Sequence, residues 1–233
     1  MNGTIGLNLH IASVVCKSTK GKERNKRMIL GLDMSTQKTG WSLWDNDEKL
    51  VDYGVWQHLG IEEPDWMNRI TLMAKGLRKL LVEYGDKIHI AYIEDNPPEL
   101  QNSQTVKMLS HLQGYMKSII DAYNIPIIFV PVAEWHNAMG FKVAGTKEYN
   151  ALRKRISEDV QRMKKVSRNA KGMLKKMSIE YANAHFGTEL NWVAFGSNKN
   201  DDDIADAINI VAYKLGYPKY DLRPMEQILG ELG

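Results

Sequence analysis

The chain has 233 residues, of which 43% are apolar and 25% charged, and this composition suffices for one globular domain with a substantial core. Cys16 is the single cysteine, which excludes an intramolecular disulfide framework and a cysteine-based metal site and favours a reducing, cytoplasmic environment. Apolar runs stay well below the roughly 20 residues that span a bilayer, so we expect no membrane association.

The formal net charge of +3 is unevenly distributed along the chain. Residues 142 to 177 carry 12 Lys and Arg against 3 acidic residues, and residues 17 to 27 carry 6 against 1. The remainder holds 13 basic and 24 acidic residues. An acidic body with two basic segments predicts a polyanionic partner near a site that needs carboxylates. Solvated lysine-rich helices are the alternative explanation.

The first secondary-structure elements expected along the chain are three short strands, at 28 to 33, 40 to 45 and 49 to 57. Short turns rich in Gly, Asn and Asp separate them, which predicts an antiparallel meander. The first strand opens at Met28 after a charged linker. We therefore expect residues 1 to 27 to be an N-terminal extension of a domain that covers 28 to 233, and either Met1 or Met28 is a candidate natural start.

Helical and strand patterns then alternate. Apolar residues three and four apart predict amphipathic helices, and short apolar runs predict buried strands. The expected elements are a helix at 64 to 84, a strand at 88 to 95, a helix at 104 to 123, a strand at 125 to 131, a short helix at 133 to 139, a basic helical stretch to about 185 and a last helix at 202 to 216. This order predicts an α/β fold with a five-stranded mixed sheet, an antiparallel meander plus two parallel strands, flanked by helices.

Carboxylates stand at the ends of two expected strands and at the start of the last helix. Asp33 and Glu94 end their strands, and Asp203 and Asp206 lie about 60° apart around the helix axis. If the two strands are parallel neighbours, their ends lie about 5 Å apart, and the helix completes a four-carboxylate cluster. Such a cluster repels itself without cations, so it predicts a seat for two Mg²⁺ ions and two-metal phosphodiester hydrolysis. Taken singly, each carboxylate also suits a turn, a strand exit or a helix cap.

Three segments carry a family resemblance: ILGLDMSTQKTGW, YIEDNPPELQNSQTVKMLSHLQGY and DDDIADAINIV. They resemble the acidic motifs of the RuvC-type Holliday junction resolvases, particularly the bacteriophage-borne branch, over residues 28 to 216. The resemblance implies an RNase H-like fold and a homodimer that cleaves four-way DNA junctions. It implies catalytic metal ligands at Asp33, Glu94, Asp203 and Asp206, for two Mg²⁺ ions with Mn²⁺ as a substitute. Asp202 is an alternative ligand to Asp203.

The basic segment 142 to 177 is longer than in the bacterial enzymes of this family and is the expected DNA contact. The candidate DNA-binding residues are Lys142, Lys147, Arg153, Lys154, Arg155, Lys164 and Lys165.

Three other functions are compatible with some of the same residues. DMSTQKTG also resembles the first phosphate motif of actin-like and sugar-kinase ATPases, but the chain lacks their second domain and has Ser35 where they have Gly, so we expect no nucleotide cofactor. We expect Ser35, Thr36 and Thr39 to close a hairpin turn and not to bind phosphate.

A nuclease of the same fold that acts on RNA or RNA–DNA hybrids is one alternative function, because the carboxylates alone do not identify the substrate. A non-catalytic junction-binding protein is the other.

Overall fold

The computed structural model describes residues 27 to 58, 63 to 95 and 103 to 232. Apart from Arg27, the expected N-terminal extension lies outside the described residues. The strands are β1 (Met28–Asp33), β2 (Lys38–Asp45), β3 (Leu50–Gln57), β4 (Ile88–Asp95) and β5 (Ile127–Pro131). The helices are α1 (Trp66–Tyr84), α2 (Ser103–Asp121), α3 (Val132–Met139), α4 (Lys147–Arg155), α5 (Val160–Phe186), α6 (Asp202–Lys214) and α7 (Met225–Gly230).

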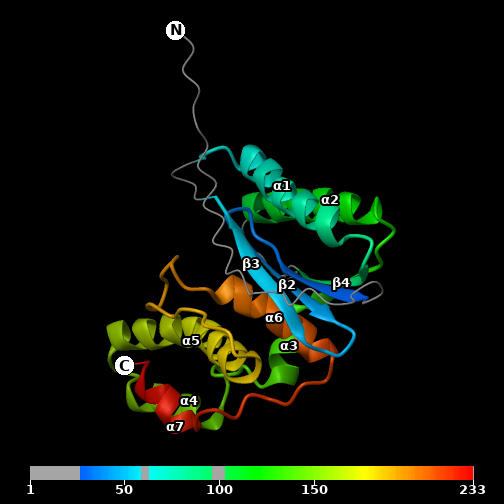
Figure 1. Ribbon diagram of the computed structural model, residues 1–233. Coiled ribbons are helices and arrows are strands. Elements are labelled where there is room, and N and C mark those ends of the chain that lie inside the picture. Colours follow the sequence, from blue (N-terminus) through cyan, green and yellow to red (C-terminus); the bar gives the residue numbers. More distant parts are fainter. Residues whose placement is uncertain (1–26, 59–62, 96–102, 233) are drawn as a thin grey trace.

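The strands form one five-stranded sheet in the order β3-β2-β1-β4-β5 (Figure 1). The pairs β1–β2 and β2–β3 are antiparallel, whereas β1–β4 and β4–β5 are parallel. Helices α1 and α2 provide the crossovers into β4 and β5. The predicted architecture, a five-stranded mixed sheet with an antiparallel meander plus two parallel strands flanked by helices, is confirmed.

Several element bounds differ from those expected. The second strand begins at Lys38, because Lys38 and Thr39 pair with the end of β3 despite their polarity. The first helix begins at Trp66, with Asp65 as its N-cap: the Asp65 carboxylate accepts a hydrogen bond from the Met67 amide at 2.9 Å. Helix α7 was not expected, because six residues are too few for a periodic pattern.

The basic stretch that was expected to be helical as far as about residue 185 is divided into two helices. Helix α4 ends at Arg155, and α5 begins at Val160. The Asp159 side chain caps α5 by accepting a hydrogen bond from the Arg162 amide at 2.9 Å. This capping fixes the start of a new helix, so the basic residues lie on two separate elements.

The sheet separates two layers of helices (Figure 1). Leu30, Leu32 and Ile93 are fully buried in the layer that contains α1 and α2. On the opposite face, Ile29 and Trp44 belong to the core formed with α3, α5 and α6. Successive residues of β1 therefore alternate between the two layers, as a strand buried on both faces requires. Within the described residues, no helix combines the length and apolarity needed to cross a membrane.

Two glycines allow α6 to lie directly on the sheet. A Cβ added at Gly31 would stand 2.2 Å from the carbonyl oxygen of Ala207, and one at Gly40 would stand 1.9 Å from that of Asp203. Neither distance is possible for a real Cβ, so both strands need glycine at these positions. Between them, Ser42 Oγ donates a 2.8 Å hydrogen bond to the Ala207 carbonyl, which fixes the helix against the meander.

Candidate active site

The carboxyl ends of β1 and β4 lie next to one another. The two strands are parallel, and Leu32 pairs with Ile93, so the next residues, Asp33 and Glu94, occupy neighbouring positions near the carboxyl ends of the strands. Since Leu32 and Ile93 face the α1–α2 layer, strand alternation directs Asp33 and Glu94 to the α6 side. The first turn of α6 lies over this edge, because Gly40 admits the Asp203 backbone.

All four carboxylates predicted as ligands are brought together here. Burial raises the pKa of Asp33 well above its ordinary value, and the charges of Glu94, Asp203 and Asp206 raise it further. Burial also raises the pKa of Asp206 well above its ordinary value, and Glu94 adds to this shift. The pKa of Glu94 is raised to about 7, mainly by burial and also by Asp203. The cluster therefore carries mutual repulsion that a cation would relieve.

Two lysines balance part of this negative charge. Lys38 Nζ lies 3.2 Å from Asp203 Oδ2, and Lys175 forms an ion pair with Asp202. Burial alone would lower the pKa of Lys175, but its hydrogen bond to Asp202 and the neighbouring carboxylates raise it above the ordinary value. The charge of Lys175 also lowers the pKa of Asp33, Glu94 and Asp206. Lys175 therefore stays charged beside the cluster.

The environments of Asp202 and Asp203 differ. The Asp202 side chain is only 7% exposed and is engaged by Lys175, whereas the Asp203 side chain is 19% exposed. Asp203 is also among the charges that raise the pKa of the two strand carboxylates, Asp33 and Glu94, whereas the charge of Asp202 raises the pKa of Asp206 and of Asp203 itself. These contacts favour Asp203 over Asp202 as the residue that acts together with the strand carboxylates.

Neutral side chains orient two of the carboxylates. The buried Trp135 of α3 donates its indole N–H to Glu94 Oε2 at 3.2 Å. The Ser178 hydroxyl of α5 donates to Asp206 Oδ1. Asn209 Nδ2 donates to Ser178 Oγ at 2.7 Å and to the Ser178 carbonyl at 3.0 Å. Because Asn209 occupies the hydroxyl oxygen as a donor, the hydroxyl hydrogen is directed to Asp206.

The sequence did not indicate these partners. Lys38, Trp135, Lys175 and Ser178 come from β2, α3 and α5, and no spacing pattern connects them with the acidic residues. Trp135 belongs to the core formed with α3, α5 and α6. The turn role preferred for Ser35 and Thr39 is confirmed, because Ser35 Oγ accepts from the Lys38 amide at 2.9 Å and Thr39 Oγ1 donates to the Ser35 carbonyl at 2.9 Å.

The donor set suits a hard divalent cation. Among the residues that the structure describes, no group of three or more His, Cys, Asp or Glu side chains is already arranged to hold a metal ion. The chemistry of the cluster nevertheless fits one: its donors are carboxylate oxygens, which Mg²⁺ and Mn²⁺ prefer. The raised pKa values of Asp33, Glu94 and Asp206 indicate that negative charge there lacks sufficient compensation.

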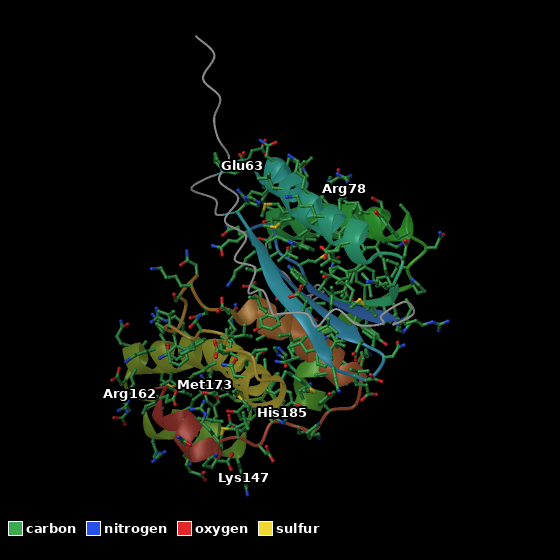
Figure 2. All side chains as sticks on the ribbon, viewed as in Figure 1. Glu63, Arg78, Lys147, Arg162, Met173 and His185 are labelled. Atoms are coloured by element: carbon green, nitrogen blue, oxygen red, sulfur yellow. The ribbon has the colours of Figure 1, made fainter. Side chains whose placement is uncertain are left out.

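The seven residues predicted to contact DNA are all exposed but do not form one group. Lys142 lies in the loop after α3, and Lys147, Arg153, Lys154 and Arg155 lie on α4. Figure 2 shows Lys147 on the side of the molecule that is remote from the sheet. Only Lys164 and Lys165 lie on α5, the helix that reaches the carboxylates.

Comparison with known proteins gives fold-level similarity only. No protein-family model matches the chain, and no curated protein matches it in sequence. Similar solved structures include Thermus thermophilus RuvC in complex with a Holliday junction substrate, with 11% identity, a TM-score of 0.49 and coverage of 80% of this chain and 92% of that one. A second Thermus thermophilus RuvC structure has 11% identity, a TM-score of 0.47 and coverage of 82% and 98%. The fowlpox virus Holliday junction resolvase has 14% identity, a TM-score of 0.33 and coverage of 81% and 97%. All three TM-scores lie below 0.5, so the function of this chain has to be inferred from its own residues.

Proposed function

We propose that this protein is a metal-dependent endonuclease that cleaves four-way DNA junctions and other branched DNA, as RuvC-type resolvases of the bacteriophage branch would. The observation that carries the proposal is the meeting of Asp33, Glu94, Asp203 and Asp206 at one edge of the sheet, where each has a raised pKa. A surface made only to bind DNA would gain nothing from buried carboxylates beside the phosphates, because like charges there weaken binding.

The four carboxylates are the proposed ligands of two Mg²⁺ ions, which Mn²⁺ can replace. When bound, such ions would activate the attacking water, stabilise the leaving oxygen and neutralise the charge that develops on the phosphate. Trp135 and Ser178 orient Glu94 and Asp206 through their hydrogen bonds, which limits the freedom of these ligands. Lys38 holds Asp203 beside the turn that follows β1, and Lys175 adds positive charge at the edge of the cluster.

DNA affinity and oligomeric state would depend on residues outside the carboxylate cluster. DNA affinity is proposed to come from the basic segment 142 to 177, including the predicted contacts on α4 and α5. We also propose a cytoplasmic homodimer, because symmetric cleavage of a four-way junction requires two sites related by a twofold axis. Light scattering of the purified chain would measure the oligomeric state directly.

The experiment that tests the proposal is a nicking assay on a labelled four-way junction, a matched duplex and an RNA–DNA hybrid, with and without Mg²⁺. We expect cleavage of the junction in Mg²⁺ only. Asp33→Asn and Asp206→Asn should each reduce the rate by about a thousandfold or more, which corresponds to about 4 kcal/mol in the barrier, while gel shifts show that junction binding is kept.

Each alternative has its own result in the same assay. Preferred cleavage of the hybrid would assign an RNase H-like activity instead. Wild-type rates in both Asn variants would show that the carboxylates are not catalytic, and binding of the junction without any metal-dependent cleavage would indicate a non-catalytic protein. Asp202→Asn and Asp203→Asn, tested in parallel, decide between these two residues as ligand: we expect the larger loss for Asp203→Asn.

A further inference from the structure

One face of α5 carries a straight row of basic residues that ends at the carboxylate cluster. Lys164, Arg168, Lys171 and Lys175 follow one another at intervals of four, three and four residues, and all are exposed. Such intervals keep the four side chains within about 60° around the helix axis and spread them over about 16 Å. We call these four residues the α5 row.

Three members of the α5 row have no polar partner within the described part of the chain. Lys164, Arg168 and Lys171 make no ion pair or side-chain hydrogen bond with any residue that the structure describes. The sequence contains no Asp or Glu between residues 160 and 179, so their charges are not compensated on their own helix. Cations placed to stabilise the fold would be paired, as Lys176 is with Glu231 and Glu180.

The fourth member connects the α5 row to the active-site edge. Lys175 pairs with Asp202 and lowers the pKa of Asp33, Glu94 and Asp206 by its charge. The opposite face of α5 packs into the core through Val166, Met173 and Met177, which holds the helix in place. The direction of the row relative to the carboxylates is therefore set by the fold.

The basic residues of α4 have a different setting. Arg153 lies over the ring of Tyr149, with 5.9 Å between its guanidinium carbon and the ring centroid. Arg155 shares a groove with Glu148 and Glu226 of α7. Lys147 lies on the side of the molecule that is remote from the sheet (Figure 2). Arg153 and Arg155 therefore have an aromatic or acidic neighbour, and Arg153 also lines a hollow with Lys164, at the end of the α5 row that is far from Lys175.

From these contacts we propose that the α5 row binds the phosphate backbone of the DNA strand that enters the active site. The inference rests on the proposed function and assigns the strand-guiding role to α5 within the basic segment. One strand of a duplex places a phosphate about every 3.4 Å along its axis, so a row of about 16 Å faces about five phosphates. The carboxylates, once neutralised by metal, would then receive the next phosphodiester of the same strand.

The test compares two variants that each lose three positive charges. Lys164→Gln/Arg168→Gln/Lys171→Gln alters the α5 row and leaves Lys175 in place, and Arg153→Gln/Lys154→Gln/Arg155→Gln alters α4. The dissociation constant for a labelled four-way junction is measured against salt concentration without divalent metal. Each phosphate contact contributes about 0.9 to the slope of log affinity against log salt. The slope should fall by about 2.7 in the α5 variant and by less than half of this in the α4 variant.

Thermal melts check that both variants fold, which their exposed positions lead us to expect. Equal loss of slope in the two variants would overturn the inference, because charge and not position would then decide binding. An unchanged slope in the α5 variant, or a wild-type protein that does not bind the junction, would also overturn it. A wild-type protein that binds but never cleaves would refute the endonuclease proposal alone, since the slopes still decide whether α5 holds the backbone.

In Mg²⁺, with protein in excess over junction, the α5 variant should cleave at least tenfold more slowly than wild type even at saturation. The α4 variant, whose charges contribute to affinity but come from the other helix of the basic segment, should lose less of its rate at saturation than the α5 variant. Loss of rate in the α4 variant, with none in the α5 variant, would assign the guiding role to α4 and overturn the inference.

Discussion

The two faces of the sheet are closed by different kinds of contact. Under α1 and α2 the sheet is covered by apolar side chains such as Leu30, Leu77 and Ile93, all fully buried. Under α6, two glycines admit the helix backbone, and Ser42 fixes it by a hydrogen bond. The difference shows that one face mainly stabilises the fold, whereas the other face positions charged groups close to the sheet.

The largest expected effect on stability concerns the apolar face. Leu77→Ala in α1 should lower the free energy of unfolding by about 3 kcal/mol, because it removes a fully buried side chain and leaves a cavity. Cleavage measured well below the melting temperature should stay near the wild-type rate. Val82→Ala is the control on the same helix, since Val82 is 79% exposed and should change stability little. A large loss of cleavage by folded Leu77→Ala protein would contradict the assignment of a mainly stabilising role to the α1–α2 face.

The second prediction concerns the carboxylates of the α6 face. Mg²⁺ or Mn²⁺ should raise the melting temperature, because a ligand that binds only the native state stabilises it by about 2.7 kcal/mol at a hundredfold excess over its dissociation constant. Melts are recorded at constant ionic strength. Asp33→Asn should melt higher than wild type without metal, since it removes a charge whose pKa is raised by burial and by its neighbours, and it should respond weakly to metal. A wild-type melt that does not change in millimolar Mg²⁺ counts against the site.

The third prediction compares a glycine of the sheet that lies under α6 with a glycine of α2. Gly40→Ala should lower the free energy of unfolding by about 1 to 3 kcal/mol, since its Cβ would collide with the Asp203 backbone. Gly114→Ala in α2 should instead raise it by about 0.5 to 1 kcal/mol, because a Cβ there meets nothing within 4 Å and alanine favours the helix. Chemical denaturation measures both. Effects of the same sign would contradict the close approach of α6.

The smallest expected effect concerns the hydrogen bond that orients Asp206. Ser178→Ala should lower the free energy of unfolding by about 1 kcal/mol and weaken Mg²⁺ binding by about tenfold, because it frees a proposed ligand. Ser118→Ala in α2 is the control, since Ser118 is exposed and bonds only to the Tyr115 carbonyl. If calorimetry finds equal Mg²⁺ affinity in wild type and Ser178→Ala, the hydroxyl has no role in orienting Asp206.

Much of the fold could be predicted from the sequence because its signals are local. Alternation and helical periodicity predicted the sheet strands and the helices α1, α2 and α6 close to their observed bounds. The positions of Asp33 and Glu94 at strand ends, and of Asp203 and Asp206 on one helix face, followed from the same local geometry. That all four meet depended on one assumption, the parallel pairing of β1 with β4, which the structure confirms.

Other features were decided only by tertiary structure. The contacts of Lys175 with Asp202, of Ser178 with Asp206 and of Trp135 with Glu94 join elements that are far apart in the chain. Such pairs leave no periodic signal, because either partner taken alone looks like an ordinary surface or core residue. The basic segment 142 to 177 likewise looks like one continuous basic stretch in the sequence. Only the break between α4 and α5, and the packing of α5 against α6, orient part of that charge toward the carboxylates.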